Sequence, residues 1–163
     1  MIVYHGSIEI IKNPDVMHSK KYLDFGQGFY LTTFENQAKK WAARKGMRQK
    51  KTPIVNVYEM SEEWQNLKVL SFEKENEEWL DFVCACRKGE PLNKEYDIII
   101  GNVADDDVFK TVDMYFRGLW DKKKVLSELR YYKMNNQICI VNQETLNRLI
   151  TFKRAYEVKD HGR

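Results

Sequence analysis

The chain has 163 residues, of which 43% are hydrophobic and 31% charged, and its formal net charge is +3 at pH 7. This length suits one domain with its own core, and the composition excludes a disordered chain and a fibrous repeat. No apolar run approaches the roughly 20 residues of a membrane span. A pI near 8.6 is too mild for a dedicated nucleic-acid binder. No signal-peptide pattern accompanies Ile2-Val3-Tyr4, so we expect a cytoplasmic protein without a membrane partner.

The first third of the chain predicts strands over residues 1–5 and 28–32, the second introduced by Gly26 and Gly28. Thr32-x-x-Glu35 has the pattern of a capping box, and the helix that follows carries an apolar stripe. Gly46 is its expected end. The stripe consists of Ala38, Trp41, Ala42 and Lys45.

The middle of the chain predicts strands over 54–60 and 67–72, then a helix over 74–87 that Gly89-Glu90-Pro91 closes. The isoleucine run of residues 96–101 is typical of a buried strand. Three cysteines, Cys84, Cys86 and Cys139, are odd in number and lack zinc-type spacing with a His pair. They are expected to be free thiols, and no metal site is expected.

The last third predicts a helix that starts at Asp105-Asp106-Asp107 and ends at Gly118, because negative charge stabilises a helix amino terminus. Asp121 caps a further helix to about Arg130, and a loop over 131–135 leads into a strand over 137–141. Asn142 caps a final amphipathic helix through Lys153. Strands scattered among unequal helices predict an α+β fold in a single domain over residues 1–163.

Three strand-end patterns carry the candidate chemistry: Tyr4-His5-Gly6-Ser7, the segment from Gly26 to Thr32, and Asn136-Gln137-Ile138. His5 beside Gly6 offers an imidazole next to a backbone that a ligand can approach closely, although a structural His fits the pattern as well. The Gly-x-Gly of the second pattern lacks the further Gly and the helix of a dinucleotide-binding fingerprint, which excludes that class of dehydrogenase. Tyr30 either projects its ring into a cleft or belongs to the core.

In this order, the three patterns resemble the His-Tyr-Glu signature of the diphtheria-toxin and poly(ADP-ribose) polymerase branch of the ADP-ribosyltransferases. The chain is also similar to uncharacterised bacterial proteins of that clan, which share Tyr-His-Gly-Ser and Asp-Phe-Gly-x-Gly-Phe-Tyr-Leu-Thr. The resemblance covers most of the chain. It implies an ADP-ribosyltransferase-like fold, with two small packed antiparallel or mixed sheets flanked by helices around an NAD cleft.

The resemblance also implies roles for individual residues. His5 would bind the ribose of NAD, the backbone of Gly6 would hold the nicotinamide carboxamide, and Tyr30 would stack on the nicotinamide ring. Trp41 would complete an aromatic sandwich, although a core Trp on that helix face is an equal alternative. Ser7 and Thr32 are further candidates for ribose or amide contacts.

Gln137 stands where the signature has its catalytic glutamate. A glutamine can bind the ribose hydroxyl but carries no charge, and losing that charge would slow transfer by about 10²-fold or more. A neighbouring carboxylate could replace the charge, and Asp24, Glu35 and Asp105 to Asp107 are the candidates. Because relatives without the glutamate lose polymer elongation, the resemblance implies the addition of single units at most.

The resemblance implies a bacterial mono-ADP-ribosyltransferase of toxin-antitoxin type that uses NAD as substrate, acts on a protein or nucleic-acid acceptor and has a small antitoxin-like partner. The alternatives are an NAD- or nucleotide-binding or protein-interaction module without transfer, and an NAD glycohydrolase. The loop over 130–136 would help to choose the acceptor. The basic segments 20–21, 48–51 and 122–124 are either solvated faces or a basic rim that attracts a dinucleotide or RNA.

Overall fold

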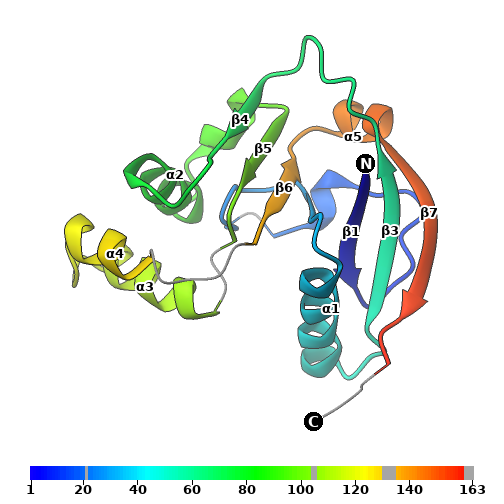
Figure 1. Cartoon of the computed structure of the whole chain (residues 1–163), viewed down its shortest axis with the longest axis horizontal. Coiled ribbons are helices and arrows are strands. Elements are labelled where there is room, and N and C mark those ends of the chain that lie inside the picture. Colours follow the sequence, from blue (N-terminus) through cyan, green and yellow to red (C-terminus); the bar gives the residue numbers. More distant parts are fainter. Residues whose placement is uncertain (21, 104–105, 130–134, 160–163) are drawn as a thin grey trace.

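The structure is a computed structural model that describes residues 1–20, 22–103, 106–129 and 135–159. Its strands form two small sheets (Figure 1). The first has the order β1-β3-β7 and is antiparallel throughout. The second has the order β2-β6-β5-β4 and is mixed, because β4 and β5 run parallel. The strands are β1 (Ile2–Ser7), β2 (Phe29–Leu31), β3 (Ile54–Met60), β4 (Val69–Ser71), β5 (Ile98–Gly101), β6 (Gln137–Ile140) and β7 (Ile150–Glu157).

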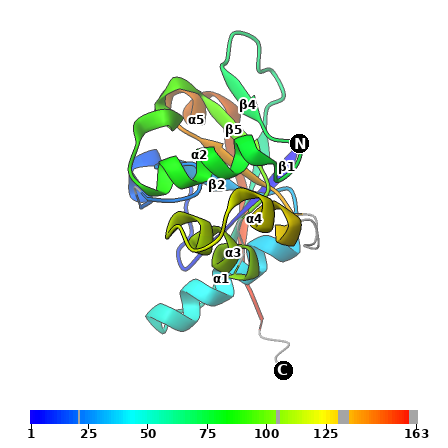
Figure 2. The same ribbon diagram turned by 90° about the vertical axis from the view of Figure 1, so that its left-hand side faces the viewer.

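Helices cover the outer face of each sheet. The α-helices are α1 (Glu35–Gln49), α2 (Glu77–Arg87), α3 (Asp106–Phe116), α4 (Lys122–Leu129) and α5 (Gln143–Leu149), with short 3-10 helices η1 (Val16–His18) and η2 (Pro91–Glu95). In Figure 1, α1 lies against the first sheet, and α2 to α4 lie on the opposite side of the molecule, beyond the second sheet. Figure 2 shows α2 in front of the second sheet, with α4 and α3 below it.

Alternating side chains divide the interior into three apolar clusters, as expected when successive strand residues point to opposite faces. Ile98, Ile138 and Ile140 join the cluster between the two sheets. Ile99 and Cys139, their neighbours in sequence, join the cluster beneath α2 to α4 instead. A third, smaller cluster fixes α1 to the first sheet. The α+β class and the two small sheets expected from the sequence are thus confirmed.

Besides packing through their shared apolar cluster, the two sheets are joined by one isolated backbone bridge among the described residues. Tyr4 of β1 and Thr32, directly after β2, form an isolated antiparallel bridge in which each amide donates to the other's carbonyl at 2.8 and 3.0 Å. Beyond this bridge the sheets diverge. The ends of β1, β2 and β6 therefore face a common space.

The predicted capping box at Thr32 is wrong. Helix α1 begins at Glu35, and Phe34 occupies its N-cap position without a side-chain bond. The hydroxyl of Thr32 instead donates to Asn136, and its backbone is held in the bridge to Tyr4. The N-cap therefore lies two residues after Thr32.

Two further boundaries differ from expectation. Helix α1 continues through Gly46 to Gln49, and Lys50 provides its left-handed cap. Gly46 instead leaves room for the backbone of the next segment, since an added Cβ would lie 2.7 Å from the Lys51 carbonyl oxygen. The final helix ends at Leu149, and residues 150–157 form β7, a strand that the sequence reading missed. The Asn142 and Asp121 caps are confirmed, since these side chains accept from the amides of Thr145 and Lys124.

The three cysteines are buried free thiols. Within the described part of the chain, no helix combines the length and apolarity needed to cross a bilayer. The expected acceptor loop falls mostly on residues 130–134, which lie outside the described residues.

Candidate functional site

A large cavity of about 1320 Å³ opens where the sheets diverge. Ligand pockets commonly measure roughly 300–1,000 Å³, so this one has room for a ligand of dinucleotide size. Five of the seven candidate catalytic and NAD-binding residues line it, as does Asp24; the five are His5, Ser7, Tyr30, Trp41 and Gln137. They come from β1, β2, α1 and β6, which the fold brings together from distant parts of the chain.

The His5 imidazole is held in its neutral form. Its Nδ1 lies 2.6 Å from the Tyr30 carbonyl oxygen, and its ring stacks on Phe29 with centroids 4.5 Å apart. Because a carbonyl only accepts, Nδ1 carries the proton and Nε2 is left as an acceptor. Burial, followed by the positive charge of Lys45, lowers the pKa of His5 to about 3, although the bond to Tyr30 opposes the shift. The site therefore presents an uncharged acceptor at neutral pH.

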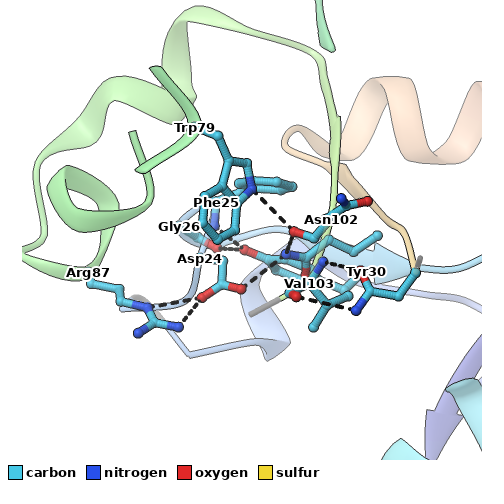
Figure 3. Close-up of polar contacts among 10 residues, drawn as sticks. Asp24, Phe25, Gly26, Tyr30, Trp79, Arg87, Asn102 and Val103 are labelled. Carbon is cyan, nitrogen blue, oxygen red and sulfur yellow. Dashed lines mark hydrogen bonds and ion pairs between the residues drawn. The ribbon is translucent and has the colours of Figure 1, made fainter. Parts of the chain in front are cut away.

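The Tyr30 hydroxyl fixes the turn that precedes its own strand. It donates to the Gly26 carbonyl at 2.5 Å and accepts from the Phe25 amide at 3.0 Å (Figure 3). Burial raises the pKa of Tyr30 well above its ordinary value, so the phenol stays protonated. With both hydroxyl bonds made inside the protein, what Tyr30 offers to a ligand is its ring.

Gln137 lies at the start of β6 and is 4% exposed. The NH2 group of its side chain donates hydrogen bonds to two acceptors. Its Nε2 donates to Asp24 Oδ2 at 3.1 Å and to the Asn102 carbonyl at 3.3 Å. The other oxygen of Asp24 accepts from Arg87 Nε at 2.9 Å, and the two side chains form an ion pair (Figure 3). A carboxylate thus lies beside the glutamine, with its charge matched by an arginine from α2.

Of the carboxylates proposed to replace a glutamate, Asp24 is the one that the structure places at Gln137. Glu35 accepts from the Tyr156 hydroxyl on β7 and is not among the cavity-lining residues. Asp105 lies outside the described residues, and the side chains of Asp106 and Asp107 are not described either.

Gly6 and Thr32 occupy scaffold positions beside the cavity. A Cβ added at Gly6 would lie 2.2 Å from the Ala38 carbonyl oxygen, so the glycine allows α1 to pack directly on β1. The Gly6 carbonyl already accepts from Lys45 Nζ at 2.9 Å. Thr32 is fully buried, and its hydroxyl donates to Asn136 Oδ1 at 2.8 Å.

Three residues that hold the site were assigned no role from the sequence, although Asn136 belongs to one of its three patterns. Asn136 ties β6 to the start of α1, since its Oδ1 also accepts from the Thr33 amide at 3.0 Å and its carbonyl accepts from Gln37. Arg87 and Asn102 hold Asp24 and Gln137 from α2 and from the end of β5. The one usable signal was the polar Asn136 directly before a buried strand; nothing local marks the other two.

Comparison with known proteins identifies a family but no activity. The family described as "Protein of unknown function (DUF3990)" matches over residues 1–152, so the chain belongs to it. Neither the search of curated proteins nor that of solved structures found a match.

Proposed function

We propose that this member of the DUF3990 family has an ADP-ribosyltransferase-like fold, binds NAD in its cavity and transfers single ADP-ribose units to a macromolecular acceptor. The observation that supports the proposal most is the convergence of His5, Tyr30 and Gln137 on one cavity. These residues lie 25 and 107 positions apart along the chain. Their order and local patterns are also those on which the resemblance rests.

The nicotinamide ring would lie between aromatic side chains. Tyr30 and Trp41 both line the cavity, and Tyr30 also packs against the apolar cluster beneath α2 to α4. Aromatic side chains stack on bases with an energy of about 1–3 kcal/mol per base. The Nε2 atom of His5 would accept a hydrogen bond from a ribose hydroxyl. Because Lys45 already occupies the Gly6 carbonyl, the expected carboxamide contact at Gly6 would require Lys45 to move or to share that oxygen.

In the proposed reaction, the bond between the ribose C1′ and the nicotinamide nitrogen breaks, and its electron pair neutralises the pyridinium. A lone pair of the acceptor forms the new bond at C1′, and the acceptor releases a proton to solvent. The carbonyl oxygen of Gln137 would hold a ribose hydroxyl during this step. Asp24 would supply negative charge close by, reduced by its ion pair with Arg87.

A second candidate is nucleotide binding without transfer. The observation that favours it is the absence of net charge at the position of the missing glutamate. There the Gln137 amide, the Asp24 carboxylate and the Arg87 guanidinium form one hydrogen-bonded group in which the two charges cancel. A glycohydrolase, with water as acceptor, shares the same cavity requirements.

Incubation with labelled NAD and bacterial lysate, followed for free nicotinamide and labelled macromolecule separately, tests the proposal. Label transferred by the wild type supports the transferase, and nicotinamide release without label supports the hydrolase. NAD binding with neither product supports the binding module. The Tyr30→Ala variant should lose binding and turnover, whereas Phe34→Ala, which removes an exposed aromatic outside the cavity, should lose neither.

A further inference from the structure

One face of α1 carries a row of cations along the cavity. Trp41, Arg44, Lys45 and Arg48 all line it, at the spacing of three and four residues that places side chains on one helix face. Lys20, from the segment before β2, lines the same cavity. Arg44, on the same helix face, already has an interaction of its own.

Three of these cations form no ion pair within the described part of the chain, although the carboxylates of Glu9, Asp15 and Asp113 line the same cavity. Neither Lys20, Lys45 nor Arg48 belongs to any of the ion pairs found there. The partner of Lys45 Nζ is a neutral group, the carbonyl of Gly6. The carboxylate of Asp24, on the cavity wall, is already paired with Arg87.

Holding these cations together is unfavourable for the protein alone. Burial lowers the pKa of Lys45, and repulsion from Arg48 and Lys20 lowers it further. Like charges at neighbouring helix positions destabilise, and a desolvated ammonium costs more than an exposed one. A bound anion would remove both penalties, because it supplies opposite charge and accepts hydrogen bonds from the cations.

We propose that Lys20, Lys45 and Arg48 form a binding site for the diphosphate group of a nucleotide. Arg48 offers a fork of donors that matches phosphate oxygens, and the two lysines act as compact charges. Lys45 and Arg48 are about 4.5 Å apart along the helix axis, so their long side chains can reach adjacent phosphates. That this diphosphate belongs to NAD rests on the proposed function; the site itself requires no nicotinamide.

A nucleic acid fits these observations less well than a nucleotide. Backbone recognition by a dedicated binder needs a basic stripe over an exposed face, whereas this row faces a cavity. The formal net charge of the whole chain is only +3. Three cations balance the two to three negative charges of a single diphosphate.

Calorimetric titration of the full chain with ADP and with inorganic pyrophosphate tests the site. The test variant is Lys45→Met/Arg48→Gln, and the matched control is Lys39→Met/Lys40→Gln, which removes two charges of the same helix that do not line the cavity. We expect the dissociation constants of both ligands to rise at least tenfold in the test variant and to stay within twofold in the control. Thermal melting of both variants shows that each is folded.

The outcomes separate this site from the proposed reaction. Equal ADP affinity in the test and control variants, or no pyrophosphate binding by the wild type, would overturn the site. ADP binding that depends on Lys45 and Arg48, together with no product from NAD, would support the site and remove the transferase. NAD turnover at subsaturating NAD that is the same in wild type and test variant would retain the transferase and reject the assignment of this diphosphate to NAD.

Discussion

Replacing Gln137 by glutamate, the residue that the resemblance leads one to restore, would place a second carboxyl group beside Asp24. In the wild type, Gln137 Nε2 donates to Asp24 Oδ2 at 3.1 Å and to the Asn102 carbonyl. A glutamate at 137 would face two acceptors with no proton to give. The variant must therefore keep its new carboxyl protonated or separate the two groups.

The expected cost follows from the separation. Two unit charges about 3 Å apart repel by about 5 kcal/mol at an effective dielectric constant near 20, which Arg87 reduces in part. Keeping a proton on Glu costs about 1.4 kcal/mol for each pH unit above its ordinary pKa of about 4.3. A carboxyl that stays protonated in the folded state thus costs about 1 kcal/mol at pH 5 and about 4 kcal/mol at pH 7.

The sign of the pH dependence is fixed by the direction of this shift. The folded variant binds a proton that the unfolded chain has released, so its stability falls as pH rises above the ordinary pKa of Glu. Urea unfolding of wild type and Gln137→Glu at pH 5 and pH 7 measures the difference. A destabilisation that is equal at both pH values would refute the contact between Gln137 and Asp24.

The double variant Asp24→Asn/Gln137→Glu exchanges the amide and the carboxylate and provides the control. Asp24→Asn alone should cost about 3–5 kcal/mol, because it leaves Arg87 without its carboxylate in a largely buried position. In the double variant, an amide again faces a carboxylate, and the extra pH dependence should disappear. Strictly additive effects of the two substitutions would contradict this account.

Three further predictions concern the rest of the cavity wall. Gly6→Ala should destabilise by about 3 kcal/mol or more in thermal melting, because its Cβ would meet α1 backbone at 2.2 Å; a melting temperature near that of the wild type would contradict the packing. Tyr30→Phe should lose about 1–3 kcal/mol of stability, since it strands the amide and carbonyl bound to the hydroxyl, while NAD affinity stays unchanged; weakened binding at full stability would assign the hydroxyl to the ligand. The lowered pKa of His5 should remove about 1 kcal/mol of stability between pH 7.5 and 5.5, because the unfolded chain gains a proton there that the folded state refuses. His5→Asn should lack this component, and identical pH profiles for wild type and variant would show that His5 titrates normally.

Much of the fold could be predicted because its signals are local. The strand over Ile54–Met60 was predicted at its observed bounds, and Asn142 caps α5 as its sequence position indicated. The strand β7 was missed because Leu146, Leu149 and Ile150 continue a helical spacing. Most of β7 is half-buried or exposed, so it lacks the apolar run of a central strand, and its pairing with β3 depends on tertiary context.

The candidate site likewise contains residues that local patterns predict and partners that they do not. His5, Tyr30 and Gln137 stood out because each lies at or beside a strand end with a recognisable neighbour pattern. The partners that define their chemistry are distant, since Asp24 lies 113 positions from Gln137 and 63 positions from Arg87. No periodicity or spacing relates such residues. The row of cations on α1 follows a spacing that can be seen in the sequence, but only the folded structure shows that Lys45 and Arg48 form no ion pairs.

The geometry of the cavity depends on how the two sheets are joined. The backbone bridge between Tyr4 and Thr32 holds β1 against the end of β2, immediately beside His5 and Tyr30. Asn136 extends this junction to β6, because its side chain bonds to Thr32 and Thr33 and its carbonyl accepts from α1. Gln137 follows directly in the chain, so the bonds of Asn136 help to fix its position relative to β1. The sequence pair Asn136-Gln137 therefore combines a joint between the sheets with a side chain that lines the cavity.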